Sequence, residues 1–326
     1  MGFTGTGKVW MNGALLDWPD ATIHIASHVI HYASGVFEGA RCYHTRRGPA
    51  CFRLDAHMRR LYDSAKIYRM EYRLPLEELT AAVLETIRAN GLKACYIRPI
   101  VYRGYEALGV NPLPCPVDAA ILVWEWEAYL GPDAQERGVD VKVSSWHRAA
   151  PNTFPALAKS VANYANSGLI KMEALAEGFS EGIALDPSGF VSEGSGQNLF
   201  LVRDRTLYTP PVGSAILAGI TRDSVIALAR DLGYRVREER IPREMLYIAD
   251  EVFLVGTAVE IAPVRSIDKI RIGHGGRGSV TAAIQRAFFE IVRGEVPDRF
   301  GWLTPVYPED GAPREAAPAH PAVERR

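Results

Sequence analysis

Residues 155–200 read PALAKSVANYANSGLIKMEALAEGFSEGIALDPSGFVSEGSGQNLF and hold three chemically distinctive side chains in a short span. Lys159 stands among small residues, where a bulky charged face would normally be expected. Asn163 and Tyr164 follow four and five positions later, a spacing that brings groups round to the same side of a helical turn. The segment therefore predicts that the lysine and the tyrosine act together.

The rest of this segment predicts a helix followed by a β-hairpin. The helix runs through Glu177, and residues 182–185 form an apolar strand candidate. Residues 187–189, Pro-Ser-Gly, reverse the chain, and the return strand leads to Glu193. Glycines at positions 194 and 196 let the backbone approach a ligand closely, so Glu193 is a candidate ligand-binding carboxylate.

A lysine, a tyrosine and a carboxylate on three consecutive elements are what pyridoxal phosphate chemistry needs. The lysine amine forms the Schiff base and later moves a proton. The carboxylate keeps the pyridine nitrogen protonated, and the tyrosine hydroxyl can bond the phenolic oxygen. Most lysines are solvated surface charges, but among the lysines of this chain only Lys159 precedes an acid set among glycines.

In these residues the chain resembles the class IV (fold type IV) aminotransferases, and within them the branched-chain amino acid aminotransferases of the bacterial kind. The resemblance covers roughly residues 8–304, so it is a whole-domain match. It implies pyridoxal 5′-phosphate as the cofactor and Lys159 as the catalytic, Schiff-base lysine. Tyr164 would bond the phenolic oxygen, and Glu193 the pyridine nitrogen.

The resemblance also implies an α/β (α+β) fold with two domains and the cofactor at their interface. A small N-terminal α/β domain would span residues 1–130, and a linker rich in turn residues would span 131–138. A larger C-terminal domain with a pseudo-barrel would span 139–304. Residues 305–326 are Pro, Ala, Glu and Arg with almost no apolar bulk, which predicts a disordered tail.

One predicted phosphate ligand is an arginine on a helix. The pattern predicts a helix that begins near Asp55, a plausible N-cap. The resemblance places Arg60 on the cofactor phosphate, whereas Arg59 is expected in solvent. Arginine suits this position because it stays charged and grips phosphate oxygens with two hydrogen bonds.

A second anion site is predicted at the start of the helix 222–231, where free amides and the Thr221 hydroxyl meet. A simple N-cap role explains Thr221 equally well. Through the resemblance, the further cofactor contacts are Leu217, Ile220 and Thr257.

The substrate pocket is predicted from the strand 95–102, which places Tyr96 and Arg98 on one face. Two inward polar groups need a partner, and a carboxylate substrate would supply one. The resemblance assigns Tyr96 to the α-carboxylate and Arg98 to the distal carboxylate of glutamate. It adds the backbone amides of a turn, Thr257 and Ala258. Four aromatic side chains would form the walls of the pocket: Tyr32, Phe37, Trp126 and Tyr129. Val110 lies in a loop that would reach the pocket of the neighbouring subunit.

Three other motif matches are rejected on their context. Residues 2–8 satisfy most of a phosphate-loop pattern, but Val9 replaces the required hydroxyl residue. Three histidines at positions 24, 28 and 31 have no accompanying acid or cysteine, so no metal is expected. Residues 273–278 match GxGxxG, but the chain ends too soon for the further parallel strand that dinucleotide binding needs.

Composition limits which partners and which cellular location we expect for the protein. The 326 residues carry a net charge of −1, which argues against a nucleic-acid partner. No apolar run approaches membrane length, and no targeting segment is recognisable, so we expect neither a membrane partner nor export. Four cysteines without CxxC spacing suggest neither zinc nor a disulfide framework, which fits a reducing cytoplasm.

The sequence thus predicts a transaminase that exchanges amino groups between leucine, isoleucine or valine and 2-oxoglutarate. Rivals on the same fold are a D-amino-acid transaminase, an R-selective amine transaminase and an aminodeoxychorismate lyase. A protein that binds the cofactor without turnover is the rival from another class. Relatives build the pocket from two subunits, so a homodimer is the minimum expected, with a hexamer of three dimers as the larger alternative.

Overall fold

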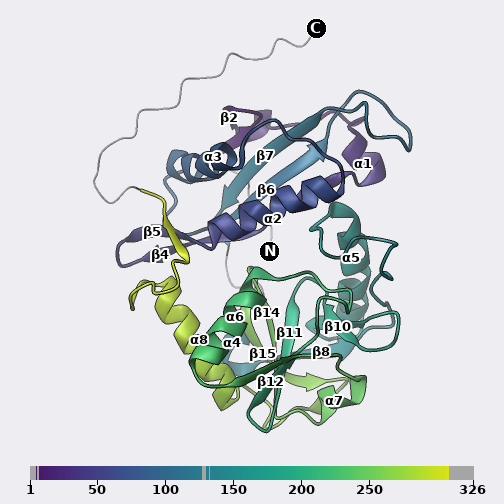
Figure 1. Ribbon diagram of the computed structural model, residues 1–326, viewed down its shortest axis with the longest axis vertical. Coiled ribbons are helices and arrows are strands. Elements are labelled where there is room, and N and C mark those ends of the chain that lie inside the picture. The colour runs from purple at the N-terminus through teal and green to yellow at the C-terminus, as the bar shows by residue number, and fades with distance from the viewer. Residues whose placement is uncertain (1–4, 6, 127–129, 132, 308–326) are drawn as a thin grey trace.

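The computed structural model describes residues 5, 7–126, 130–131 and 133–307. Within these residues the chain forms two β-sheets, one above the other in Figure 1, each with its own helices. Strands from residues 8 to 124 build most of the first sheet, and strands from residues 139 to 271 build the second. The mixed α/β class expected from the sequence is confirmed.

The first sheet is antiparallel and has the order β17-β5-β4-β6-β7-β1-β2, with β3 beside β6. Its elements are β1 (Lys8–Met11), β2 (Ala14–Asp17), η1 (Trp18–Asp20), α1 (His28–Tyr32), β3 (Gly35–Phe37), β4 (Ala40–Thr45), β5 (Gly48–Phe52), α2 (Leu54–Ile67), α3 (Leu76–Ala89), β6 (Cys95–Arg103), β7 (Val117–Trp124) and β17 (Leu303–Pro305).

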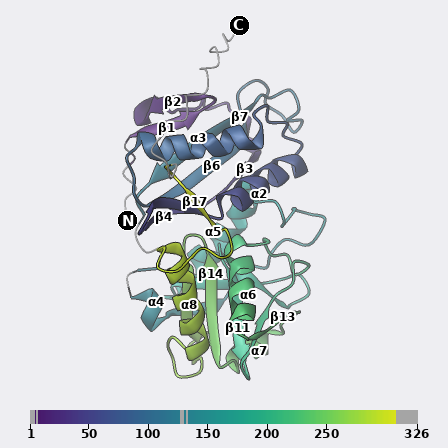
Figure 2. The same ribbon diagram turned by 60° about the vertical axis from the view of Figure 1, so that its left-hand side comes forward.

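Two helices cover one face of this sheet, α2 and α3, which lie across it in Figure 2. Leu54, Met58 and Leu61 recur at helical spacing along α2 and are fully buried in the core that also holds Ile97 of β6. Burying each such side chain contributes about 1.5–3 kcal/mol. The apolar stripe of α2 therefore fixes which of its side chains face away from this core, and Arg60 is one of them.

The second sheet is mixed and has the order β10-β9-β8-β15-β14-β11-β12-β13, with β16 beside β15. Its elements are α4 (Ala134–Arg137), β8 (Val139–Val143), α5 (Val161–Ala176), β9 (Glu181–Leu185), β10 (Val191–Gly194), β11 (Asn198–Arg203), β12 (Thr206–Thr209), α6 (Ile220–Asp231), β13 (Arg235–Glu238), α7 (Arg243–Tyr247), β14 (Glu251–Gly256), β15 (Glu260–Ile267), β16 (Ile270–Arg271) and α8 (Ser279–Val292).

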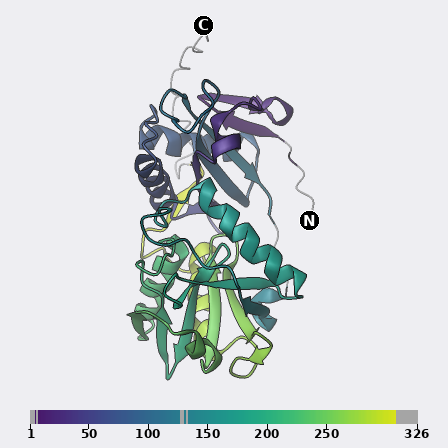
Figure 3. The same cartoon turned by 90° about the vertical axis from the view of Figure 1, so that its right-hand side faces the viewer.

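Helical crossovers join parallel neighbours in this sheet. Strands β8 and β9 are parallel and connected through α5, and β12 and β13 are parallel and connected through α6. Helix α5 reaches from the second sheet toward the first (Figure 3), and its N-cap residue Ser160 forms a bridge with Val36 of β3. The start of α5 and the end of β3 are thereby fixed against each other.

The end of the described chain returns to the first sheet. Strand β17 pairs with β5, and Val306 beyond it is buried and donates its amide to Pro49 (2.9 Å). Phe52 makes edge contacts with Phe288 of α8 and with Trp302, which links the two halves of the molecule. The boundary expected at residue 305 thus falls inside an ordered contact, and residues 308–326 lie outside the described part.

Several expected boundaries shift by one to three residues. Asp55 is wrong as the N-cap of α2, because Arg53 takes a left-handed conformation (φ 51°) directly after β5 and the helix begins at Leu54. Helix α6 begins at Ile220 with Gly219 as N-cap, so Thr221 lies in its first turn. Lys159 precedes the α5 N-cap and is not itself helical.

The GxGxxG match lies in a loop between β16 and α8. Strand β16 is antiparallel to β15, unlike the parallel arrangement that dinucleotide binding uses. Gly278 is needed for packing, since a Cβ there would lie 1.9 Å from Cδ of Glu251. The Glu251 carboxylate accepts hydrogen bonds from the Val280 and Thr281 amides (3.0 and 2.8 Å) at the start of α8.

Among the helices of the described part, none is both long and apolar enough to cross a bilayer.

Candidate active site

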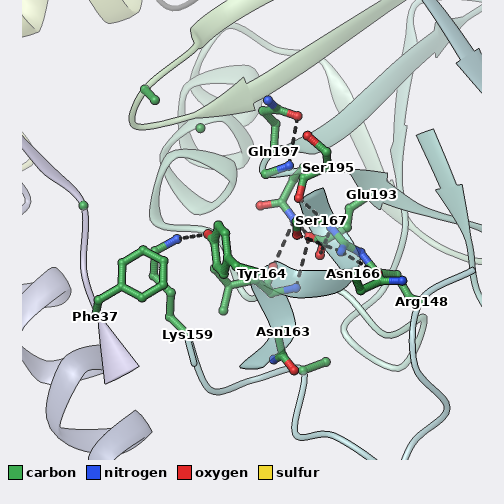
Figure 4. A pocket seen from close by; sticks show the side chains of 18 of the residues that line it. Phe37, Arg148, Lys159, Asn163, Tyr164, Asn166, Ser167, Glu193, Ser195 and Gln197 are labelled. Carbon is green, nitrogen blue, oxygen red and sulfur yellow. Dashed lines mark hydrogen bonds and ion pairs between the residues drawn. The ribbon is translucent and has the colours of Figure 1, made fainter. Parts of the chain in front are cut away.

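A cavity of about 560 Å³ lies where the two sheets meet, within the size range of small-molecule and cofactor sites. Figure 4 shows Phe37 entering it from the first half and Lys159, Tyr164 and Glu193 from the second. Most of the site residues expected from the sequence line this one cavity: Phe37, Arg60, Tyr96, Arg98, Trp126, Lys159, Tyr164, Glu193, Leu217, Ile220, Thr221, Thr257 and Ala258.

Lys159 is held by its backbone on both sides. Its amide donates to Ser64 Oγ (3.0 Å) on α2, and its carbonyl accepts from the Phe37 amide (3.0 Å). The Asn163 side-chain amide bonds the carbonyls of Pro155 and Ala158 (3.1 and 3.2 Å), which closes the loop before the lysine. The amine is therefore aimed into the cavity by a rigid segment.

The Lys159 amine meets the Tyr164 hydroxyl at 2.6 Å. The rings of Phe37 and Tyr164 lie 5.1 and 5.0 Å from Lys159 Nζ and pack edge to face against each other. The Lys159 amine thus has Tyr164 as its hydrogen-bond partner and two aromatic rings as neighbours. Such an amine is available to react with a carbonyl group.

Glu193 lies deep in the cavity wall with both of its oxygens engaged. Oε1 is 3.2 Å from Nη2 of Arg148, and Oε2 accepts from Asn198 Nδ2 (3.0 Å) and from the Leu217 amide (3.1 Å). Burial raises the pKa of Glu193, while Arg148 and the Leu217 amide act to lower it. The carboxylate is fixed in place beside a protein cation.

Arg148 is a site residue that sequence reasoning missed. Its guanidinium donates to Asn166 Oδ1 and Ser167 Oγ of α5 (3.0 Å each) and to the carbonyls of Gly194 and Ser195 (2.6 and 2.9 Å). It therefore joins α5 to the end of β10 and the residue after it, beside Glu193 (Figure 4). No motif surrounds residue 148, so no local signal could have identified it.

The opposite end of the cavity has groups that typically bind anions. Helix α6 begins there, and its first amides have no partner within the helix. Arg60 reaches the same place and donates from Nη1 to the Ala218 carbonyl (2.8 Å). A side chain at Gly219 is excluded, because its Cβ would lie 1.9 Å from Asn198 Oδ1. The helix start and the Arg60 guanidinium therefore both border this end of the cavity.

Arg98 occupies an aromatic box. Its guanidinium carbon lies 4.7, 5.4 and 5.8 Å from the ring centres of Phe37, Tyr96 and Trp124. Its Nε is buried and makes no hydrogen bond within the described residues. The Tyr96 ring in turn packs edge to face on Trp126. This corner combines an apolar wall with a cation whose Nε is still free to donate.

Two residues expected in the pocket do not line the cavity of this chain. Tyr32 is 45 % exposed and Val110 is 89 % exposed. They are linked to each other, because the buried His28 stacks on Tyr32 (4.5 Å) and bonds the carbonyl of Gly109 (2.8 Å). Tyr32 lies on α1 at the surface and does not line this cavity, so its place in a substrate pocket stays a prediction. Tyr129 lies outside the described residues.

The histidines at positions 24, 28 and 31 have structural roles. His28 bonds Ser34 Oγ and the Gly109 carbonyl, and His31 bonds the Ile25 carbonyl (2.9 Å). No group of three or more His, Cys, Asp or Glu side chains within the described ranges could hold a metal ion. Arg59 is exposed, as expected.

The fold and this site define a class IV aminotransferase. The family model described as amino-transferase class IV matches residues 35–267, more than half of the chain, and the chain therefore belongs to that family. The fold type IV architecture expected from the sequence is confirmed by solved structures of the family.

Within the family, the chain is similar to branched-chain-amino-acid aminotransferases. The enzyme of that name from Salmonella typhimurium is 52 % identical over 299 residues, which cover 91 % of this chain and 97 % of that one. The crystal structure from Escherichia coli has a TM-score of 0.92 at 50 % identity and covers 93 % of this chain and 100 % of its own. The T.th. enzyme complexed with N-(5′-phosphopyridoxyl)-L-glutamate has a TM-score of 0.89 at 48 % identity, with 93 % and 99 % coverage.

Proposed function

We propose that this protein is a branched-chain amino acid aminotransferase that uses pyridoxal 5′-phosphate. It would transfer the amino group of L-leucine, L-isoleucine or L-valine to 2-oxoglutarate, reversibly and in ping-pong order. The observation that carries the proposal is that the Lys159 amine, paired with Tyr164 at 2.6 Å, shares one cavity with the buried Glu193 carboxylate. The T.th. relative that was solved with a phosphopyridoxyl-glutamate compound supports both the cofactor and the glutamate partner.

The residues present fit the cofactor at each of its functional groups. Lys159 would bind the aldehyde carbon, Tyr164 the phenolic oxygen and Glu193 the pyridine nitrogen. Arg60 and the start of α6, with Thr221, would bind the phosphate, and Leu217 and Ile220 would pack beside the ring. Thr257 lies on the turn after β14 and lines the same cavity, and we propose that its hydroxyl also contacts the phosphate. When bound, pyridoxal phosphate supplies a carbonyl that accepts the amino group and a ring that withdraws electrons.

The chain's own residues would then carry out the proton transfers. The incoming amino group would displace Lys159, and the freed lysine amine would take the proton from the substrate Cα and deliver it to the former aldehyde carbon of the cofactor. Tyr164 holds that amine in place between transfers. Glu193 keeps the pyridine nitrogen protonated through a charge-assisted hydrogen bond, a type worth about 1.5–3 kcal/mol. In the second half-reaction, with 2-oxoglutarate, these residues act in the reverse order.

One pocket must accept an apolar branch and a charged chain in turn. The aromatic side chains of Phe37, Tyr96 and Trp126 suit the branch. Arg98, whose buried Nε lacks a hydrogen-bond partner within the described residues, suits the distal carboxylate of glutamate. We propose that the amides of Thr257 and Ala258, with Tyr96, receive the α-carboxylate. Tyr129 is proposed as a further wall residue.

We propose that a second copy of this chain completes the pocket, so that a homodimer is the smallest active form. Its support is the exposed apolar surface formed by α1 and the loop after β6, where Tyr32 and Val110 lie, and by the outer face of α5 with Met172 and Leu175 (60 % and 56 % exposed). Tyr32 and Val110 would enter the partner's cavity. Light scattering at micromolar concentration tests this, and a monomeric holoenzyme with full activity would contradict it; a hexamer of three dimers is consistent with it.

We further propose a cytoplasmic location and the division into domains 1–130 and 139–304. The location is supported by the four cysteines, which are all buried free thiols. The division is supported by the two sheets, although β17 near the end of the chain pairs with the first of them.

The direct test of function is to mix the holoenzyme with L-leucine and 2-oxoglutarate and to measure glutamate. If the cofactor absorbance is normal but no glutamate forms, the transaminase proposal is wrong and the protein only binds the cofactor. Turnover of L-leucine, D-alanine and a chiral primary amine side by side separates the rival enzymes of this fold. We expect L-leucine to be the best of the three, and its failure there would overturn the substrate assignment.

A further inference from the structure

We propose that Glu38, supported by His57, is a positioning residue that aims the Arg60 guanidinium at the cofactor phosphate. This inference rests on the proposed function, because it concerns the phosphate of pyridoxal phosphate. It assigns a task to two buried ionisable residues that otherwise have no part in the chemistry. Neither residue touches the reacting atoms.

The geometry is a side-on ion pair with a third partner behind it. Arg60 donates from Nε to Glu38 Oε1 (2.6 Å) and from Nη2 to Oε2 (3.0 Å). His57 donates from Nδ1 to the same Oε2 (2.7 Å). Glu38 and His57 are 0 % and 1 % exposed, so the carboxylate and the imidazole are shielded from solvent. An ion pair of this depth has a desolvation cost that is offset only by full hydrogen bonding.

The three partners come from two elements. Glu38 follows β3 directly, and its amide donates to the Pro99 carbonyl of β6 (2.8 Å). His57 and Arg60 are three positions apart on α2, which places them on one side of that helix. The carboxylate therefore has a fixed position on the sheet, and the arginine is drawn to it from the helix.

The charge states follow from the contacts. Burial alone would raise the pKa of Glu38, but the Arg60 cation and the His57 hydrogen bond hold it well below the usual range. Burial lowers the pKa of His57, so the imidazole is neutral. An ionised carboxylate only accepts hydrogen bonds, and Nδ1 of His57 must then carry the proton.

Two N–H groups of Arg60 are not used by the hydrogen bonds that the described residues make with it. A guanidinium has five N–H donors. Three are used within the described residues, two by Glu38 and one by the Ala218 carbonyl. One N–H on each terminal nitrogen remains, and these two donors suit the oxygens of a phosphate. Without Glu38, the long arginine side chain would sample other rotamers and would have to be ordered each time phosphate binds.

The test compares pyridoxal phosphate with pyridoxal, which lacks the phosphate. Full-length protein stripped of cofactor is titrated with each compound, and binding is followed by the absorbance of the bound compound. In Glu38→Gln we expect affinity for pyridoxal phosphate to fall about tenfold to a hundredfold, the range for a lost charge-assisted contact. Affinity for pyridoxal should stay within about twofold of wild type, since it lacks the phosphate that Arg60 is proposed to bind.

Glu251→Gln is the matched control. It also removes a buried, hydrogen-bonded carboxylate, but at the start of α8 and away from Arg60. We expect it to lower stability while leaving the ratio of the two affinities at the wild-type value. If Glu38→Gln fails to fold, Glu38→Asp keeps the charge but is one methylene shorter, and we expect the same selective loss.

A second arm asks whether Glu38 acts through Arg60. In an Arg60→Gln background, adding Glu38→Gln should cause no further loss of affinity for pyridoxal phosphate. Equal losses for both compounds in Glu38→Gln, or no loss for either, would overturn the positioning role. Wild-type protein that binds neither compound would instead overturn the proposed function, so the two failures are distinguishable.

Discussion

Arg148 Nη2 lies 3.2 Å from Oε1 of Glu193, and the side chains of both residues are about nine-tenths buried. Burial alone would push the pKa of this glutamate upward, and Arg148 is the largest opposing influence. The pKa of the carboxylate that is proposed to hold the pyridine nitrogen is raised by burial, and the Arg148 cation limits how far it rises. This pair determines the pH range over which the site can work.

Arg148→Gln should raise the pKa of Glu193 further. Activity needs the ionised carboxylate, which is lost as pH falls through that pKa, so the acidic limb of the kcat/KM profile should move to higher pH. We expect a shift of about one pH unit, with a loss that approaches about tenfold only on the acidic limb and recovers as pH rises. Arg148→Lys keeps the charge and serves as the control. An acidic limb that stays in place in Arg148→Gln would contradict this role.

Arg98→Ala should separate the two substrates. The arginine is enclosed by Phe37, Tyr96 and Trp124 and carries a buried Nε without a partner in the described chain. We expect kcat/KM for glutamate to fall about tenfold to a hundredfold, because a charged contact is lost, and kcat/KM for leucine to fall much less. Steady-state kinetics with both amino acids measures this. Equal losses would remove Arg98 from recognition of the distal carboxylate.

Gly39→Ala should damage the substrate pocket through Tyr96. A Cβ at Gly39 would lie 1.9 Å from the Tyr96 hydroxyl, so the tyrosine would have to move. We expect KM for leucine to rise about tenfold while cofactor affinity is kept. Gly213→Ala is the control, since a Cβ there meets nothing within 4 Å. Unchanged KM in Gly39→Ala would show that the Tyr96 position is not critical.

The sequence could predict the part of the site that is local in the chain. Lys159 and Tyr164 are five positions apart, and Glu193 belongs to the next hairpin, so segment spacing was enough to group them. The resemblance added partners from distant segments, of which Arg60, Leu217 and Thr257 line the same cavity. The elements themselves followed from apolar periodicity, as in α2 and β6.

The remainder depends on long-range packing. Glu38 meets Arg60 across 22 positions, and Arg148 meets the Gly194 carbonyl across 46. Neither residue lies in a motif, because only the sheet order brings β3 to α2 and the loop after β8 to β10. The error in the N-cap of α2 has a local cause. The backbone of Arg53 takes a left-handed conformation and starts the helix at Leu54, so Asp55 lies inside the first turn and is not the cap. Tyr32 is exposed in this chain, and a sequence alone does not tell which subunit's pocket such a side chain would enter.

Glu173 should stabilise the protein in a pH-dependent way. It lies on α5, the helix of Tyr164. Its carboxylate accepts hydrogen bonds from the Lys142 amine of β8 (2.9 Å) and from the hydroxyl of Ser144, which follows that strand. Burial opposes ionisation, but the Ser144 and Lys142 contacts lower the pKa of Glu173 from 4.5 to about 2. A depressed carboxyl pKa stabilises the fold above the unfolded value, and this stabilisation is lost as pH falls from 4.5 toward 2.

Glu173→Gln should therefore lower the free energy of unfolding by about 1–3 kcal/mol at pH 7. The difference from wild type should shrink as pH falls below the ordinary glutamate value. Denaturant unfolding at several pH values measures it. A difference that does not depend on pH would mean that the ion pair contributes nothing and that the loss arises from packing alone.

Borohydride reduction tests the central claim most directly, since it fixes a cofactor bonded through an imine to its lysine. The reduced holoenzyme is digested and the peptide that carries the pyridoxyl group is sequenced by mass spectrometry, with Lys159→Ala treated in parallel. We predict that the label lies on Lys159 and that the variant takes up none. A label on any other lysine, or no label in the wild-type holoenzyme, would contradict the account.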